Sequence, residues 1–90
     1  MGNNTMRYKV QGCIIPDTPQ EDELIEPFSV WLDAGSHLES AAMFILEYPK
    51  VNSARIWVVD EDYTMFVCPL EHAKLRADYI VGLRTYDKKT

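Results

Sequence analysis

The stretch Ser36-His37-Leu38-Glu39-Ser40-Ala41-Ala42-Met43-Phe44-Ile45-Leu46-Glu47-Tyr48-Pro49 carries the clearest helix signal in the chain. Ser36 and Glu39 form a capping box, in which the Ser36 hydroxyl accepts from the N–H of Glu39 and the Glu39 side chain reaches back. Apolar residues then recur at helical spacing until Pro49 stops the helix. They are Leu38, Ala41, Ala42, Ile45 and Leu46. We expect Leu38, Ile45 and Leu46 to face a sheet.

Strand patterns lie on both sides of this helix. Alternating polar and apolar residues predict strands over 7–15 and 28–33 before it, and a hairpin of 54–59 with 63–68 after it. The hairpin loop Asp60-Glu61-Asp62 leaves the register open. A three-residue loop would oppose Trp57 to Met65, and a four-residue loop would oppose it to Phe66. Pro69 suits the first turn of a short helix over 70–78, and alternation over 79–86 predicts a last strand.

These elements predict the order β-β-α-β-β-α-β. Without its first strand the order is βαββαβ, that of the ferredoxin-like split unit. We therefore expect an α+β fold, with a single antiparallel sheet of four or five strands and one long and one short helix on one face. One domain of residues 1–90 would have a frayed N-terminus (1–5), an acidic loop (17–27) and a polar tail (87–90). Its radius of gyration should be about 12 Å.

Composition narrows the class of protein. A chain that is 47% hydrophobic and 11% aromatic is not intrinsically disordered, and two cysteines do not make a disulfide scaffold. No apolar run approaches the ~20 residues of a transmembrane helix, and the N-terminus lacks the layout of a signal peptide. We expect a cytoplasmic protein without a membrane partner.

Charge is distributed unevenly along the chain. Lys and Arg number 9 against 14 Asp and Glu, for a net charge of −5. All of the excess comes from residues 10–49, which contain no Lys or Arg. This asymmetry predicts a charged partner, or only a solvated acidic loop that keeps the protein soluble. A net acidic chain argues against direct nucleic-acid binding, which needs a basic surface.

No arrangement of residues predicts catalysis. Cys68 and His72 would lie close together at the start of a helix, but no third residue orients them and Glu71 opposes a thiolate. His37 reads as a neutral surface histidine. Two His and two Cys do not give a zinc pattern, and no Gly-rich phosphate loop is present. We therefore expect no catalytic residue, no metal and no cofactor.

The candidate binding residues are one exposed tryptophan and a set of carboxylates. Trp31 shares a strand face with Ser29 and Asp33, whereas most other aromatics are expected to pack in the core. An outward Trp with acidic neighbours is typical of a protein contact. The predicted partner-binding residues are Asp17, Glu21, Asp22, Glu23, Glu26, Trp31 and Asp33.

Part of the chain resembles a known kind of small protein. Leu38–Pro49, then Asn52-Ser53-Ala54, then Phe66-Val67-Cys68-Pro69-Leu70 resemble short phage-encoded α+β inhibitors of the anti-CRISPR kind. The resemblance covers about half the chain and implies a protein that blocks a host nuclease complex by occupying a surface.

We therefore predict a non-enzymatic protein-binding module, an inhibitor that occludes a basic, nucleic-acid-handling surface of a protein partner. The alternative is a small ligand-binding or dimerising regulatory domain of ferredoxin-like fold, and the chain is expected to be a monomer or a homodimer. An exposed sheet face that is continuous and aliphatic would favour dimerisation. An aromatic face with an acidic rim would favour a different protein as partner.

Overall fold

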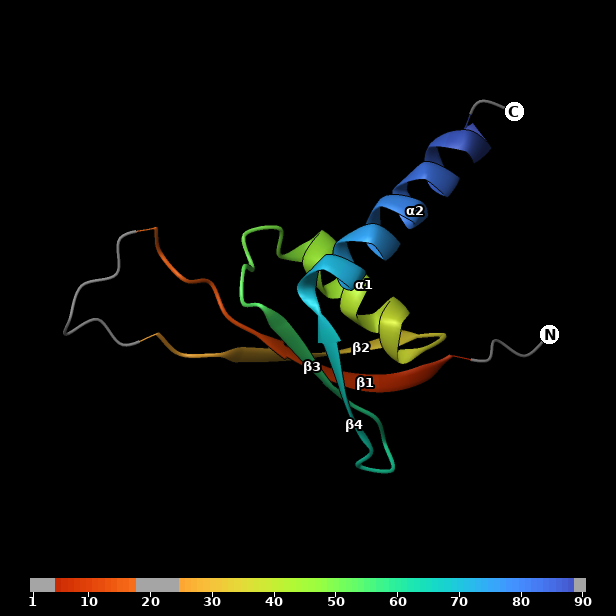
Figure 1. Cartoon of the computed structure of the whole chain (residues 1–90). Coiled ribbons are helices and arrows are strands. Elements are labelled where there is room, and N and C mark those ends of the chain that lie inside the picture. The colour runs from red at the N-terminus through yellow and green to blue at the C-terminus, as the bar shows by residue number, and fades with distance from the viewer. Residues whose placement is uncertain (1–4, 18–24, 89–90) are drawn as a thin grey trace.

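The computed structural model describes residues 5–17 and 25–88, which form one β-sheet with two helices on one side of it (Figure 1). The elements are β1 (Met6–Gly12), β2 (Phe28–Ala34), α1 (His37–Glu47), β3 (Arg55–Val59), β4 (Met65–Pro69) and α2 (Leu70–Lys88). The predicted α+β class and the antiparallel sheet are confirmed. Most of the predicted frayed terminus (1–5) and of the predicted acidic loop (17–27) lies outside the described residues.

The sheet has the strand order β2-β1-β3-β4, and every neighbouring pair is antiparallel. β1 pairs with β2 along its whole length, from Met6 opposite Ala34 to Gly12 opposite Phe28. Because β2 and β3 both run antiparallel to β1, they are parallel to each other. Parallel strands need a crossover connection, and α1 supplies it. The crossover carries α1 across one face of the sheet.

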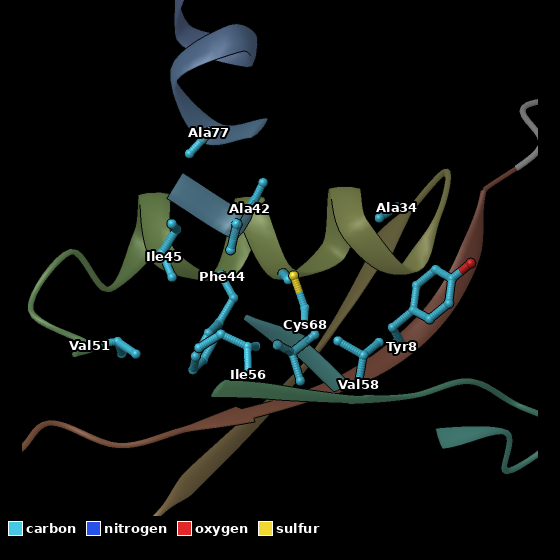
Figure 2. Packing of buried hydrophobic residues seen from close by; sticks show 13 residues of the cluster. Tyr8, Ala34, Ala42, Phe44, Ile45, Val51, Ile56, Val58, Cys68 and Ala77 are labelled. Carbon is cyan, nitrogen blue, oxygen red and sulfur yellow. The ribbon is translucent and has the colours of Figure 1, made fainter. Parts of the chain in front are cut away.

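The two faces of the sheet have opposite environments, because successive side chains of a strand point to opposite sides. Tyr8 of β1, with Ile56 and Val58 of β3, is buried beneath α1 (Figure 2). Val10 of β1 is buried on the same face, opposite Val58. The intervening residues lie on the opposite face, which neither helix covers (Figure 1). We call this opposite side the open face. It carries Arg7, Lys9, Gln11, Ser29, Trp31, Asp33, Arg55, Trp57, Val59, Met65 and Val67.

α1 begins at the predicted capping box. The Oγ of Ser36 accepts from the backbone N–H of Glu39 at 3.1 Å. The predicted sheet-facing side was only partly right, since Leu38 and Leu46 are half-buried. Phe44 is fully buried instead, and its ring contacts the strands: a Cβ at Gly12 would lie 2.9 Å from Phe44 Cε2.

α2 contradicts the predicted last strand over 79–86, because one continuous helix runs from Leu70 to Lys88. Ala73, Ala77 and Ile80 recur at helical spacing and pack into the core. Ala77 lies on the side of α1 that faces away from the strands (Figure 2). A short alternating run fits a strand as well as a helix, and packing against α1 decides for the helix. The fifth strand is therefore absent from the described residues, and the ferredoxin-like order is not confirmed.

The β3–β4 hairpin has a register that differs from both predicted ones. Trp57 lies opposite Val67, and Val59 lies opposite Met65. The strands are linked one pair further on, where the N–H of Asp60 donates to the carbonyl of Thr64 at 3.2 Å. The Asp60 carboxylate closes the loop, since its Oδ1 accepts from the N–H groups of Asp62 and Thr64, each at 2.9 Å. A side chain within the loop thus sets the register.

α2 extends beyond the sheet, and its C-terminal turns point away from the other elements (Figure 1). The radius of gyration is 14.5 Å, above the expected value of about 12 Å. Neither helix among the described residues combines the length and the apolar character that a membrane crossing requires.

Candidate binding site

The open face exposes large apolar side chains on three of its four strands. Trp31 on β2 is 51% exposed, and on β4 Met65 is 63% and Val67 42% exposed. Trp57 and Val59 on β3 are half-buried. A hollow of about 400 Å³ lies over the middle of this face. Its lining consists of Lys9, Gln11, Trp57, Val59 and Met65.

A second cavity lies where the open face meets the β3–β4 loop, and we call it the tip cleft. It measures about 380 Å³ and is lined by Arg7, Trp31, Asp60, Glu61 and Tyr63. The backbone N–H of Arg7 donates to Glu61 Oε1 at 3.1 Å, which ties the loop to β1. The Cζ of Arg7 lies 5.7 Å from the centre of the Trp31 ring, a cation–π contact.

Two carboxylates, Asp60 and Glu61, line the tip cleft, and others lie nearby in the strand and loop. Asp33 is opposite Arg7 on the neighbouring strand, and Glu61 and Asp62 are exposed in the loop. Asp60 is 8% exposed and is held by the loop N–H groups. Arg7 is the one cationic side chain that lines the cleft among the described residues. Charges of both signs therefore surround Trp31. Lys9 is opposite it on β1 and Arg7 lies over its ring, whereas Asp33 and the loop carboxylates lie beside the cleft.

The start of α1 holds the loop from the other side of the sheet. The Nε2 of His37 lies 3.5 Å from Oδ2 of Asp60. Its ring centre is 5.1 Å from that of Tyr8 and 5.1 Å from that of Phe66. His37 is therefore half-buried, and not the surface residue that the sequence predicted. Burial raises the pKa of the Tyr8 phenol, and the carboxylates of Asp60 and Glu39 raise it further.

The predicted binding residues fall into two groups. Trp31 and Asp33 lie on the open face beside the tip cleft. Asp17 and Glu26 are exposed, but they lie beyond the end of the β1–β2 pair at which Gly12 is opposite Phe28. Asp33 lies five positions further along β2 than Phe28, about 17 Å away. Glu21, Asp22 and Glu23 lie outside the described residues. Among the residues described, the acidic loop thus does not share one site with Asp33.

Four residues that line the tip cleft were missed as binding residues: Arg7, Asp60, Glu61 and Tyr63. The sequence assigned Glu61 to a turn and Tyr63 to the start of a strand. Their proximity to Trp31 depends on the pairing of β1 with both β2 and β3. This pairing brings Arg7 into contact with Glu61, which lies 54 positions further along the chain. Only the acidic character of the turn signalled this site in the sequence.

Cys68 and His72 have different environments. Cys68 is 1% exposed within the core, and its Sγ donates to the carbonyl of Pro69 at 3.4 Å. Burial raises the pKa of this thiol, which disfavours a nucleophilic thiolate. His72 is exposed on α2. In the part of the chain that the structure describes, no three His, Cys, Asp or Glu residues are grouped to hold a metal ion.

Another exposed apolar surface, apart from the open face, runs along α2. Leu75, Tyr79 and Leu83 follow one another at four-residue spacing and are 68%, 52% and 48% exposed. The Cζ of Arg76 lies 4.9 Å from the centre of the Tyr79 ring and covers part of it. Glu71 and Asp78 are exposed carboxylates near this stripe on α2. The stripe offers control positions for tests of the open face.

Comparison of the chain with protein families, with curated proteins and with solved structures finds no match. The resemblance to phage-encoded inhibitors stays a prediction.

Proposed function

We propose that this chain is a non-enzymatic binding module that recognises a protein partner with the open face of its sheet. One observation carries the proposal: Trp31 is 51% exposed on a face that both helices leave uncovered. Trp, Tyr, Met and Arg are enriched in protein interfaces, and an exposed Trp beside a cavity is a typical hot spot. Trp57, Met65 and Val67 extend the same apolar surface across β3 and β4.

The net charge of −5 and the carboxylates beside the tip cleft favour a partner with a basic surface. The open face also carries Arg7, Lys9 and Arg55, which would pair with acidic groups of that partner. Asp33, Glu61 and Asp62 would face that surface while Trp31 is buried against it. Charge of this kind steers association and excludes acidic competitors. In its sharpest form the partner is a nucleic-acid-handling protein, and the module inhibits it by covering its basic groove.

Single substitutions on exposed side chains test this proposal. Tagged wild type, Trp31→Ala, Met65→Ala and Leu75→Ala would each be used for affinity capture from a lysate of the producing cell. A partner retained by wild type and Leu75→Ala, but depleted at least about 10-fold by Trp31→Ala, supports the open face. Thermal melts would establish that all four chains are folded. Equal retention by all four would contradict the proposal.

Two further measurements separate the other classes of partner. Binding of a fluorescent oligo-dT strand that depends on Trp31 would make the open face a nucleic-acid surface, since exposed aromatics also stack on bases. Sedimentation of the pure protein tests the dimerising alternative. A dimer that Met65→Ala dissociates would place a second copy of the chain on this face.

The acidic loop is tested separately, by changing Glu21→Gln, Asp22→Asn and Glu23→Gln together. If these carboxylates steer a basic partner, association slows and depends less on salt, because screening shortens from ~10 Å at 0.1 M to ~3 Å at 1 M. The melting temperature should stay the same. An unchanged rate and salt slope would leave the loop as a solubilising segment.

A further inference from the structure

We propose that the tip cleft is the subsite for one cationic side chain of the partner, an arginine or a lysine. This inference rests on the proposed function and adds the chemistry of the contact. The cleft joins two aromatic side chains, Trp31 and Tyr63, to the carboxylate of Glu61. An aromatic face together with a carboxylate favours a cation over a neutral or an anionic group.

The backbone of Tyr63 points to a role outside the fold. Tyr63 has a φ of 62°, the one positive value for a non-glycine residue in the described chain. A three-residue hairpin loop after a type I turn places its last residue in this left-handed region, where glycine and asparagine are favoured. Tyrosine is strained there, and its side chain is 87% exposed, so it gains little burial in return. A bulky aromatic at such a position is explained if the ring contacts a partner.

Arg7 makes a cation–π contact within the chain like the one we propose for the partner's side chain. Its guanidinium lies over Trp31, with Cζ 5.7 Å from the ring centre, in the geometry that an external cation would adopt. Arg7 therefore competes with the partner's side chain for the ring and repels it by charge. Removing Arg7 should strengthen binding of a cation, a result opposite to that expected if Arg7 itself recognised an anion.

Glu61 and Asp60 have different parts in this subsite. Glu61 uses Oε1 to accept from the backbone of Arg7, and its second oxygen has no hydrogen-bond partner among the described residues. Asp60 holds the loop through the N–H groups of Asp62 and Thr64, so it is a positioning residue. Glu61 is thus the carboxylate that would pair with the incoming cation.

The test titrates the full-length protein with four peptides, acetyl-Gly-Xaa-Gly-amide, where Xaa is Arg, Lys, citrulline or Glu. Citrulline keeps the shape of arginine without its charge. The indole N–H signals of Trp31 and Trp57 in two-dimensional NMR report the two halves of the open face. We expect the Arg and Lys peptides to shift the Trp31 signal saturably and the citrulline and Glu peptides to leave it in place.

Three variants sharpen the result. Tyr63→Asn relieves the backbone and removes the aromatic wall, so the Arg peptide should bind about 3- to 10-fold more weakly. The melting temperature of this variant should equal or exceed that of wild type, whereas a purely structural tyrosine would lower it on removal. Glu61→Gln should weaken the Arg peptide about 3-fold, and Arg7→Gln should strengthen it.

Equal binding of the citrulline peptide, preferred binding of the Glu peptide, unchanged affinity in Tyr63→Asn or weaker binding in Arg7→Gln would each overturn the cationic subsite. The proposed function fails separately. If Met65→Ala, which lies outside the cleft, still depletes the captured partner, the open face stands without this subsite.

Discussion

The imidazole Nε2 of His37 lies 3.5 Å from the Oδ2 of Asp60, and this contact joins the first turn of α1 to the loop between β3 and β4. Asp60 is at the same time the acceptor for the N–H groups of Asp62 and Thr64. The pair of His37 and Asp60 thus links α1 to the loop that forms a wall of the tip cleft. The shape of the cleft depends on a carboxylate that is 8% exposed and is held by the loop N–H groups and by His37.

Asp60→Ala should therefore destabilise the fold by about 1–3 kcal/mol, because two N–H groups lose their acceptor. The measurement is urea unfolding followed by tryptophan fluorescence. Asp62→Ala is the matched control, since it removes an exposed carboxylate from the same loop and should change stability by less than about 0.5 kcal/mol. Similar losses in both variants would show that Asp60 does not hold the loop.

Glycine-to-alanine changes should have opposite signs at two positions. At Gly12 the new Cβ would meet Phe44 Cε2 at 2.9 Å and Val51 Cγ1 at 3.1 Å, so Gly12→Ala should cost about 1–3 kcal/mol. At Gly82 nothing lies within 4 Å, and the residue is helical, so Gly82→Ala should stabilise by about 0.5–1 kcal/mol. Chemical denaturation measures both. If Gly82→Ala destabilised the protein, the result would argue against a helix at this position and for the strand predicted over 79–86.

The buried face of α1 is tested by comparing Phe44 with Leu46. Phe44 is 0% exposed and contacts the strands, so Phe44→Ala should cost about 3–5 kcal/mol. Leu46 is half-buried and lines a groove with Lys74 and Ala77 of α2, so Leu46→Ala should cost less than about 2 kcal/mol. Unfolding free energies from the same denaturant series give the order. If Leu46→Ala lowered the free energy of unfolding more than Phe44→Ala, Leu46 and not Phe44 would be the main contact of α1 with the sheet.

Stability should fall in alkaline solution through Tyr8. In the folded protein the pKa of its phenol is raised above the ordinary value of about 10 by burial and by the carboxylates of Asp60 and Glu39. Below pH 10 both states keep the proton, so the contribution is intact. Above it the unfolded chain releases a proton that the folded chain retains, so the free energy of unfolding declines as pH rises.

Tyr8→Phe should therefore flatten the decline above about pH 10, as measured by urea unfolding at each pH. The Cys68 thiol, whose pKa is raised above its ordinary value by burial, adds a dependence of the same sign that remains in the variant. An identical slope in wild type and Tyr8→Phe would mean that the phenol ionises alike in both states.

Local patterns were sufficient for five of the six elements, including β4 apart from its register, and for the first half of α2. The period of two in 7–11 and 28–33 predicted β1 and β2 and their faces, with Trp31 outward, because burial of one face imposes alternation. The capping box at Ser36 and the apolar spacing after it predicted α1. β3 was likewise recognised by its β-branched residues. The exposed Trp31 and its neighbour Asp33 were the part of the candidate site that the sequence could locate, since both lie on one strand.

The sequence by itself thus determined the α+β class, the acidic charge of residues 10–49 and the outward tryptophan, all of which depend on neighbours along the chain. Tertiary structure decided the rest. Residues 79–86 are helical because Ala77 and Ile80 pack into the core. The hairpin register follows from the Asp60 carboxylate, which accepts two N–H groups that no strand pattern specifies. The tip cleft exists because β1 pairs with both β2 and β3 and so brings Arg7, Trp31 and Tyr63 together from three distant segments.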